Sequence, residues 1–187
     1  MIVASFDHCL PNILVHCCCA PCAGFVLELL ASEYKCSVLF YNPNIEPQEE
    51  YEKRLLAMKN LLKRNSLLAR VEMKECFYNN EDFTECVSSR SKEPEGGSRC
   101  SICFQLRLKQ TARLAFECGF DYFTTTLSVS PHKNARLINE AGIKAAKEYG
   151  VNYLCADFKK NGGFQKSVAI SKMYNLYRQN YCGCIRI

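Results

Sequence analysis

The sequence predicts a single-domain α/β fold in which a parallel sheet carries helices on both faces. Three observations predict it: β-prone and helix-forming segments alternate, no internal repeat or long linker interrupts them, and 187 residues suit one domain with a full core. We therefore expect residues 1–187 to form one domain that ends in a cysteine-containing C-terminal tail.

Hydrophobic periodicity places the individual elements. Runs rich in β-branched and aromatic residues predict strands at 12–15, 37–41, 67–73, 121–125 and 152–156. Apolar residues at helical spacing predict helices at 23–34, 47–64, 103–118, 133–149 and 165–178. The long polar segment 75–98 is expected to be a lid or a support for a nearby site.

Three segments rich in polar or sulfur groups follow strands of this sheet. The cysteine run at 17–19 follows the first strand, the turn at Asn42 follows the second, and segment 124–130 follows a later one. Because ligands bind beyond the carboxyl ends of parallel strands, we expect these segments to converge on one site.

Composition indicates a globular protein of the cytoplasm. The chain is 48% hydrophobic and 23% charged, and no apolar run approaches the roughly 20 residues that span a bilayer. Asp7, His8 and Pro11 interrupt the N-terminal apolar stretch, so we expect neither a signal peptide nor a membrane partner. A net charge of +5 is compatible with RNA binding.

The 14 cysteines are the most unusual feature of the composition. A reducing cytosol and a chain long enough to bury a core argue against a disulfide scaffold and favour metal ligation or redox chemistry. The cysteines cluster at 17–22, 100–103 and 182–184. Most of the others are expected to be small buried apolar residues: Cys9, Cys36, Cys76, Cys86, Cys118 and Cys155.

The first cluster combines adjacent cysteines with the start of a helix. Side chains alternate along a strand, but at a strand-to-helix turn the backbone can aim Cys18 and Cys19 at one point. Pro21 suits the first turn of a helix. The dipole of that helix would favour thiolate.

The second cluster, Cys100 and Cys103, is a C-x-x-C pair that opens a helix, which is typical of a metal site or of thiol–disulfide exchange. Added to Cys18 and Cys19, it supplies four thiolates, enough for a four-iron cluster or a structural zinc. Zinc ligands generally come as separated pairs, so the adjacent pair favours iron–sulfur.

The third cluster is Cys182 and Cys184. A single intervening residue forces any disulfide between them into a tight ring, and strained disulfides are more easily reduced. The spacing suits a redox pair that turns over. Two metal ligands or two exposed tail residues would have the same spacing.

Candidate substrate-binding residues lie in three polar segments. Segment 124–134 leads hydroxyls, a histidine and a lysine into a helix start, which suits phosphate or ribose. The C-terminal segment interleaves basic and aromatic residues that could contact phosphates and stack on bases. A solvated loop and a solvated cationic face explain these patterns about as well. The candidates are Asn42, Asn44, Ser128, His132, Lys133 and Arg178.

Together these segments resemble the QueH family of epoxyqueuosine reductases. The resemblance runs in order from residue 15 to 184 and rests on several long and chemically unusual blocks. The matching residues are Cys18-Cys19-Ala20-Pro21-Cys22; Tyr41-Asn42-Pro43-Asn44-Ile45 with Pro47, Glu50 and Tyr51; Glu95-Gly96-Gly97 with Arg99, Cys100 and Cys103; Thr125-Thr126-Leu127-Ser128 with Ser130, Pro131, Lys133 and Asn134; and Tyr177-Arg178-Gln179-Asn180-Tyr181-Cys182-Gly183-Cys184.

The resemblance implies the last step of queuosine synthesis, in which the epoxide of epoxyqueuosine at the wobble base of tRNA is reduced to an alkene. It implies a redox-active disulfide between Cys182 and Cys184, a second, mononuclear iron near Cys22, and an electron donor that the sequence does not identify. Cys17 falls outside the pattern. The four-iron four-sulfur cluster implied by the resemblance would be held by Cys18, Cys19, Cys100 and Cys103.

Two other classes remain open. The expected sheet is Rossmann-like and similar to that of adenine-nucleotide hydrolases and PP-loop tRNA-modifying enzymes, but those carry Ser-Gly-Gly-x-Asp-Ser where this chain has cysteines at 17–22. A zinc-stabilised RNA-binding module is the non-enzymatic alternative. It predicts a colourless protein, whereas the cluster predicts a brown, oxygen-sensitive one.

Overall fold

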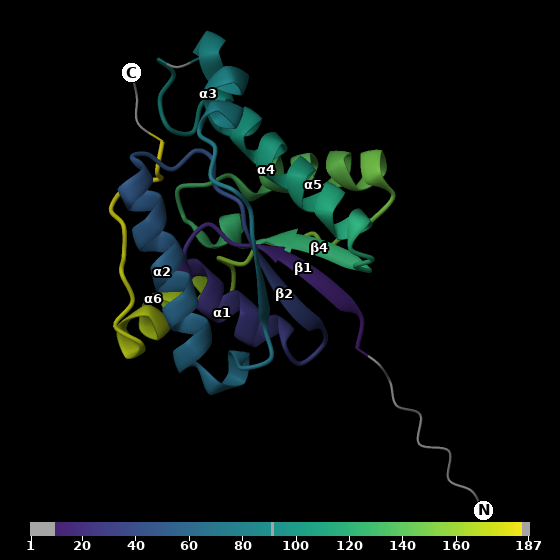
Figure 1. Ribbon diagram of the computed structural model, residues 1–187, viewed down its shortest axis with the longest axis vertical. Coiled ribbons are helices and arrows are strands. Elements are labelled where there is room, and N and C mark those ends of the chain that lie inside the picture. Colours follow the sequence, from purple (N-terminus) through teal and green to yellow (C-terminus); the bar gives the residue numbers. More distant parts are fainter. Residues whose placement is uncertain (1–9, 91, 185–187) are drawn as a thin grey trace, which may run out of the picture.

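Five parallel strands form the centre of the molecule (Figure 1). The structure is a computed structural model that describes residues 10–90 and 92–184. The strands lie in the order β3-β2-β1-β4-β5, so the chain winds outwards in both directions from β1. Their bounds are β1 Asn12–His16, β2 Lys35–Phe40, β3 Glu72–Glu75, β4 Tyr122–Thr125 and β5 Asn152–Tyr153.

Helices cover both faces of this sheet, as the sequence predicts. Figure 1 shows α1, α2 and α6 on one side and α4 and α5 on the other, with the short α3 packed near the first turns of α4. Their bounds are α1 Ala20–Leu30, α2 Gln48–Arg64, α3 Glu81–Val87, α4 Ser98–Glu117, α5 Ala135–Tyr149 and α6 Gly163–Met173. Short 3₁₀ turns span Ser66–Leu68, Ser88–Arg90 and Thr126–Val129.

Alternation along β1 divides the core between the two faces. Ile13 and Val15 point to the side of α1 and α2, and Leu14 points to the side of α4 and α5. All three side chains are fully buried. A central strand buried on both faces needs apolar residues throughout, which is why this run lacks the polar alternation of a half-exposed strand.

Several predicted boundaries are wrong. The third strand begins at Glu72, because the 3₁₀ turn Ser66–Leu68 takes up the start of the predicted run 67–73. That turn forms because the Asn65 side chain accepts a hydrogen bond from the Leu67 amide at 3.0 Å. Segment 75–98 is not one long loop, since it contains α3. Helix α4 begins at Ser98, before the predicted start at 103.

The last helix also ends earlier than predicted. Helix α6 stops at Met173, and Asn175 takes a left-handed backbone conformation with φ of 48°. Arg178 therefore lies in an irregular tail. This tail runs antiparallel to α2: Arg64, at the end of α2, donates to the carbonyl of Tyr174, while Arg54 donates to the carbonyl of Cys182.

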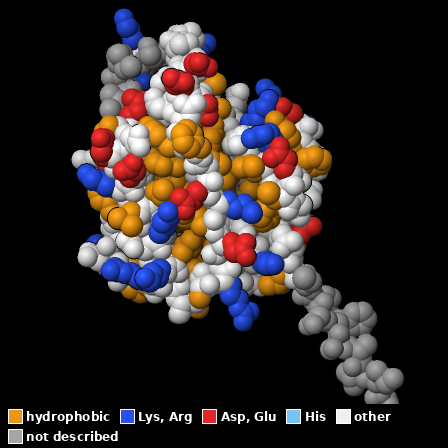
Figure 2. Space-filling model, in the orientation of Figure 1, with side chains coloured by type: hydrophobic (Ala, Val, Ile, Leu, Met, Phe, Trp, Pro, Cys, Tyr) orange, Lys and Arg blue, Asp and Glu red, His pale blue; other side chains and the backbone are white. Residues whose placement is uncertain are grey.

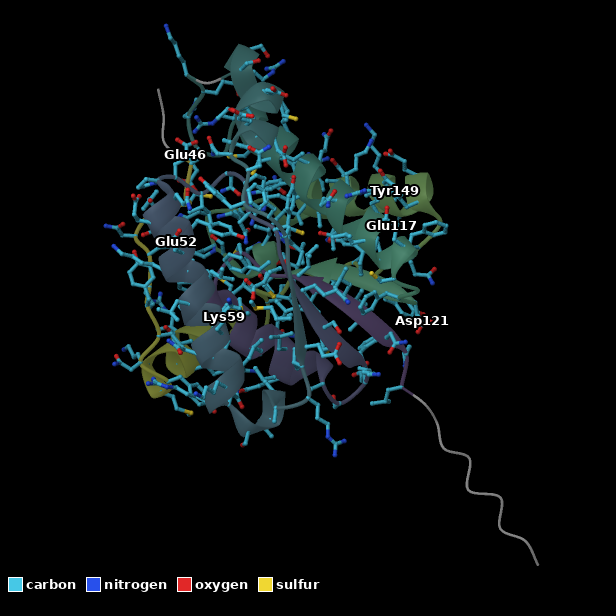
Figure 3. The ribbon with its side chains drawn as sticks, viewed as in Figure 1. Glu46, Glu52, Lys59, Glu117, Asp121 and Tyr149 are labelled. Atoms are coloured by element: carbon cyan, nitrogen blue, oxygen red, sulfur yellow. The ribbon has the colours of Figure 1, made fainter. Side chains whose placement is uncertain are left out.

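The two ends of the sheet differ in what surrounds them. In Figure 3, Asp121 lies at the end where the strands begin, and its carboxylate accepts a hydrogen bond from the Asn12 amide at 2.8 Å. Glu46 lies at the opposite end, beside the C-terminal tail. On the face shown in Figure 2, basic and acidic side chains are interspersed with apolar surface.

Among the described residues, none of the helices combines the length and the apolar character that a membrane crossing requires.

Candidate active site

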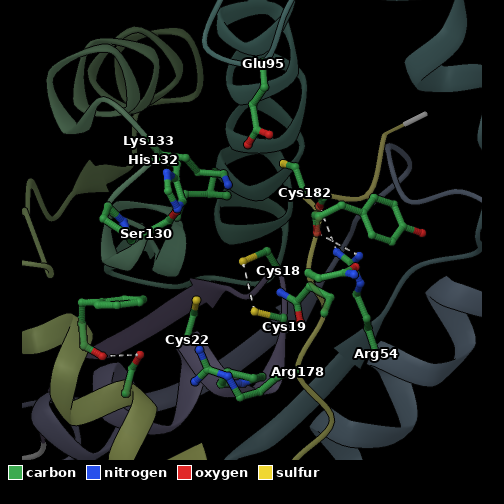
Figure 4. A pocket seen from close by; sticks show the side chains of 18 of the residues that line it. Cys18, Cys19, Cys22, Arg54, Glu95, Ser130, His132, Lys133, Arg178 and Cys182 are labelled. Atoms are coloured by element: carbon green, nitrogen blue, oxygen red, sulfur yellow. Dashed lines mark hydrogen bonds between the residues drawn. The ribbon is translucent and has the colours of Figure 1, made fainter. Parts of the chain in front are cut away.

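A cavity of about 340 Å³ opens beyond the carboxyl ends of β1 and β4 (Figure 4). The parts of the chain that meet there include the turn after β1, the loop after β4, the start of α6 and the C-terminal tail. Cys18 and Cys19 come from the first, Ser130 and Lys133 from the second, and Cys182 from the last. Of the three segments predicted to converge here, the cysteine turn and the loop after β4 line the cavity, whereas the turn at Asn42 does not.

Three thiols gather on one wall of the cavity. Among the residues that the structure describes, the sulfur atoms of Cys18, Cys19 and Cys22 lie within 4.8 Å of one another. The local backbone explains the grouping: β1 ends at His16, Cys19 caps α1 in an extended conformation, and Pro21 occupies the first turn. Cys22 then lies one turn further along the helix, on the side of the cap.

Hydrogen bonds among the three thiols favour the thiolate form of Cys18 and the protonated form of Cys19 and Cys22. Hydrogen bonds from Cys19 and Cys22 hold the pKa of Cys18 well below its ordinary value, against the opposing effect of burial. Donation to Cys18 raises the pKa of Cys19 to about 12 and also raises that of Cys22. Because thiolate is the form that ligates metals, and three soft donors face one point, this group could hold a metal ion.

A buried guanidinium lies beside the thiols. Arg107 is 2% exposed, and its Nη1 lies 3.9 Å from the Cys103 sulfur. Its Nε donates to His16 Nε2 at 3.2 Å, and its Nη2 donates to the side-chain oxygen of Asn42. Burial works to lower the pKa of Arg107, but its electrostatic interactions with Cys103 and Cys18 outweigh burial and raise the pKa.

His16 is neutral in this environment. Burial, followed by the charge of Arg107, lowers the pKa of His16 to about 3. The ring contacts three groups: Nε2 lies 3.2 Å from Arg107 Nε and 3.1 Å from the Tyr41 carbonyl oxygen, and Nδ1 lies 2.8 Å from the Thr125 hydroxyl. The imidazole therefore orients Arg107 rather than exchanging protons.

Cys100 and Cys103 lie near the cavity but outside the three-thiol group. Cys100 lines a smaller adjoining cavity of about 60 Å³, which shares Glu95, His132 and Lys133 with the main one. Burial raises the pKa of the Cys103 thiol to about 11. The joining of these two cysteines to Cys18 and Cys19 stays a prediction.

The tail places its two cysteines differently. Cys182 lines the cavity, whereas Cys184 packs in a small apolar cluster with Phe83, Val87 and Cys103. Both are free thiols in this structure. A hydrogen bond from Cys184 lowers the pKa of Cys182 to about 6, against burial and with help from Lys133, whereas donation to Cys182 raises the pKa of Cys184. The pair thus holds one thiolate and one thiol.

Only three of the substrate-binding candidates reach the cavity: His132, Lys133 and Arg178. Burial works to lower the pKa of Lys133, but the thiolates of Cys182 and Cys18 outweigh it and raise that pKa. The other candidates are buried within the protein and absent from its lining: Asn42, Asn44 and Ser128.

Two of those buried residues serve the scaffold. The Asn42 side chain donates to the carbonyl of Cys17 at 2.9 Å and accepts from Arg107. The Ser128 hydroxyl accepts from the Phe158 amide at 3.2 Å. Their polar atoms therefore hold the loops behind the cavity.

Sequence reasoning missed two arginines of the cavity wall, Arg54 and Arg107. A signal existed for each. Arg107 follows Cys103 by four residues, which places both on one face of a helix, and Arg54 shares the buried face of its helix with Met58 and Leu61. An arginine inside an apolar stripe marks a charge that needs partners.

Comparison with known proteins agrees with this geometry. A family model described as "QueH: Epoxyqueuosine reductase QueH" matches residues 13–186. A protein of Streptococcus pyogenes named epoxyqueuosine reductase QueH is 42% identical over 94% of this chain and 69% of its own length.

Two further relatives bear the same name. One from Staphylococcus epidermidis is 41% identical over 94% of this chain and 75% of its own length. One from Thermotoga maritima is 36% identical over 93% of this chain and 88% of its own length. With the family model matching nearly the whole sequence and the cysteine segments meeting at one cavity, the chain belongs to the QueH family of epoxyqueuosine reductases.

Proposed function

We propose that this protein removes the epoxide oxygen of epoxyqueuosine in tRNA and leaves the alkene of queuosine. The observation that carries the proposal is the meeting of Cys18, Cys19, Cys22 and Cys182 at one cavity, in a member of this family. Thiols from the N-terminal turn and from the tail face the same space, so metal and thiol chemistry could act on one bound base.

The residues of the cavity wall suit a metal group. The donors that gather there are sulfur atoms, which select iron–sulfur clusters and zinc over harder cations. We propose a 4Fe-4S cluster held by Cys18, Cys19, Cys100 and Cys103, and a second, mononuclear iron for which Cys22 is a ligand. When bound, such groups would pass electrons singly and polarise the epoxide oxygen.

The tail pair can supply both electrons that the reaction consumes. Reducing an epoxide to an alkene and water consumes two electrons and two protons. Oxidation of the Cys182 thiolate and the Cys184 thiol to a disulfide breaks one S–H bond, forms one S–S bond and releases two electrons and one proton, and the second proton comes from water. Cys182 faces the cavity as the thiolate and Cys184 retains a proton, so the pair could replenish or complete the reduction.

Charged and aromatic side chains at the cavity suit a nucleotide of an RNA loop. Lys133 and Arg178 could bind phosphate, while Phe164 and Tyr181 offer aromatic surfaces on which an unstacked base could pack. We propose that the anticodon wobble base enters here, in the cytoplasm, and that an electron donor as yet unidentified reduces the protein between turnovers.

Anaerobic purification followed by quantification of iron and sulfide tests the metal part. We expect brown protein with about four iron and four sulfide per cluster, plus iron in excess of sulfide for the second site. A colourless protein that holds zinc would instead support an RNA-binding module.

Assay on tRNA that carries epoxyqueuosine tests the reaction. We expect Cys182→Ser and Cys184→Ser to stop multiple turnover, with Cys118→Ser, a change at an exposed cysteine, as the matched control. Unchanged multiple turnover in both tail variants would remove the thiol pair from the mechanism.

A further inference from the structure

One buried side chain on α2 holds the backbone of the Cys182-Gly183-Cys184 turn. Arg54 is 2% exposed, and its two terminal nitrogens donate to consecutive carbonyls of the tail, Nη1 to Cys182 at 2.9 Å and Nη2 to Tyr181 at 3.2 Å. The guanidinium carbon also lies 5.1 Å from the centre of the Tyr181 ring. Three separate contacts thus fix the residues that lead into the turn.

Glu50 fixes the guanidinium in turn. Arg54 Nε donates to one Glu50 oxygen at 2.8 Å, and the Tyr177 hydroxyl donates to the other at 2.8 Å. Both members of this ion pair are buried, and a buried ion pair contributes little net stability over an apolar pair of similar shape. A lysine could not replace this arrangement, because only a planar guanidinium presents donors in one plane to three acceptors.

Gly183 is fitted to the same contacts. Its φ of +127° is a conformation that L side chains rarely adopt, and a Cβ there would lie 2.9 Å from Ile45 Cγ1 and 3.1 Å from Arg54 Nη1. Its carbonyl accepts from the Glu46 amide at 2.9 Å, and the Tyr181 hydroxyl donates to the Glu46 carbonyl. Contacts with segment 44–46 and with α2 therefore hold the turn in one position.

The position of the turn determines where each thiol lies. With the carbonyls of residues 181 and 182 fixed, the Cys182 side chain faces the cavity. The Cys184 side chain lies against the start of α4, where its sulfur is 3.6 Å from Arg99 Nη2 and packs beside Phe83 and Val87. Neither placement follows from the sequence spacing of the two cysteines.

We propose that Arg54 is a positioning residue for the Cys182–Cys184 pair: by binding the two carbonyls before Gly183, it holds the Cys182 thiol in the cavity and the Cys184 thiol against α4. The proposal rests on the proposed redox role of that pair. Arg54 takes no part in the bond changes, which are oxidation of the Cys182 thiolate and the Cys184 thiol to one disulfide, with loss of two electrons and one proton, and delivery of those two electrons, that proton and one proton from water to the epoxide oxygen.

The test is the alkylation rate of Cys184 by iodoacetamide in the full-length protein under anaerobic conditions, with the modified peptide identified by mass spectrometry. Loss of the two charge-assisted hydrogen bonds predicts at least about a tenfold faster reaction in Arg54→Lys. The double variant Glu50→Gln/Arg54→Met, which leaves no unpaired buried charge, should show the same increase.

A matched control exists on the same helix. Arg64 is exposed and also donates to a carbonyl of the segment after α6, that of Tyr174, but does not touch the Cys-Gly-Cys turn. Arg64→Met should leave the Cys184 rate within about twofold, since surface changes of this kind cost little. An unchanged Cys184 rate in both Arg54 variants would overturn the proposal.

Gly183→Ala changes the position of the same turn without altering Arg54. We expect it to release Cys184 as the Arg54 variants do. Gly119→Ala is its control, because Gly119 also has positive φ but its Cβ would meet no atom within 4 Å. A faster Cys184 reaction in Gly119→Ala as well would show that general backbone strain, and not the position of the tail, controls the alkylation rate. That result would count against the proposal.

Turnover on epoxyqueuosine tRNA completes the test. In Arg54→Lys, kcat should fall about tenfold or more, because the Cys182 thiol is displaced from the cavity. Faster alkylation with unchanged kcat would overturn the positioning role. Unchanged turnover in Cys182→Ser is a different result: it would end the thiol step of the proposed function, and the Arg54 proposal with it.

Discussion

Two sets of thiols border the same cavity, and the protein holds them in different ways. Cys18, Cys19 and Cys22 lie where the central strand β1 passes into α1, so they cannot separate unless the sheet and the helix do. Cys182 belongs to a tail without helix or strand, held by side chains of α2. The first set should therefore respond to global unfolding, and the second to local release.

The largest effect should follow from removing a thiol of the first set. In Cys18→Ser the group loses its thiolate, so we expect metal affinity to fall by more than the 10- to 100-fold that is typical for loss of an outer partner. Absorption titration with a thiolate-binding metal such as cobalt measures this without any assay of activity. Cys118→Ser, at the exposed end of α4, is the control. Full metal affinity in Cys18→Ser would contradict the assignment.

A substitution in the core at β1 should lower global stability without changing the exposure of the tail. Leu14 is fully buried between the sheet and α4, so Leu14→Ala should lower the free energy of unfolding by about 2–5 kcal/mol. Urea denaturation measures the change, with exposed Leu56→Ala expected within about 0.5 kcal/mol of the wild type. Under native conditions the alkylation rate of Cys184 should stay unchanged in Leu14→Ala. A large rise would mean that the tail and the core open together.

The smallest effect concerns the segment that leads into α4. Hydrogen bonds from the Ser98 hydroxyl, from Arg90 and from the Arg99 amide lower the pKa of Glu93 from 4.5 to about 2. Because the fold favours the ionised carboxylate, its stabilising contribution is complete above about pH 4.5 and is lost as the pH falls towards 2.

Hydrogen exchange of the peptide 93–99, corrected for intrinsic rates, should therefore increase in that acid range. Glu93→Gln should show the same exchange at every pH in it. Glu81→Gln, a change in the first turn of α3, is the control and should retain the pH dependence. Retention of the full pH dependence in Glu93→Gln would show that another group is responsible.

The sheet and its cysteine-bearing edge could be predicted because their signals are local. The apolar run of β1, the adjacent cysteines and Pro21 occupy consecutive positions, so periodicity and helix-start chemistry locate them together. The third strand was misplaced because Leu67 and Leu68 look equally β-prone. Only the Asn65 side chain, which bonds to the Leu67 amide, turns that segment into a 3₁₀ turn with Leu67 outside.

The tail and the charged wall of the cavity could not be predicted, because their contacts join residues far apart in the sequence. Arg54 contacts Tyr181 and Cys182, which lie more than 120 positions away in the sequence. The residues of neither segment predict its contact with the other. The prediction that Asn42 binds substrate was wrong for a related reason. A polar residue after a strand can bind a ligand or stabilise a loop, and here the Asn42 side chain hydrogen-bonds to the Cys17 carbonyl and to Arg107.

The antiparallel course of the tail along α2 has a consequence for biosynthesis. On the ribosome, the segment 12–30 that carries the three thiols is made long before Lys133, but the cavity gains its last wall only when residues 177–183 dock on α2, whose sequence ends more than a hundred residues earlier. Early sulfur ligands would then stand open to solvent during synthesis, and loading of metal before release of the chain would meet no obstruction from the tail.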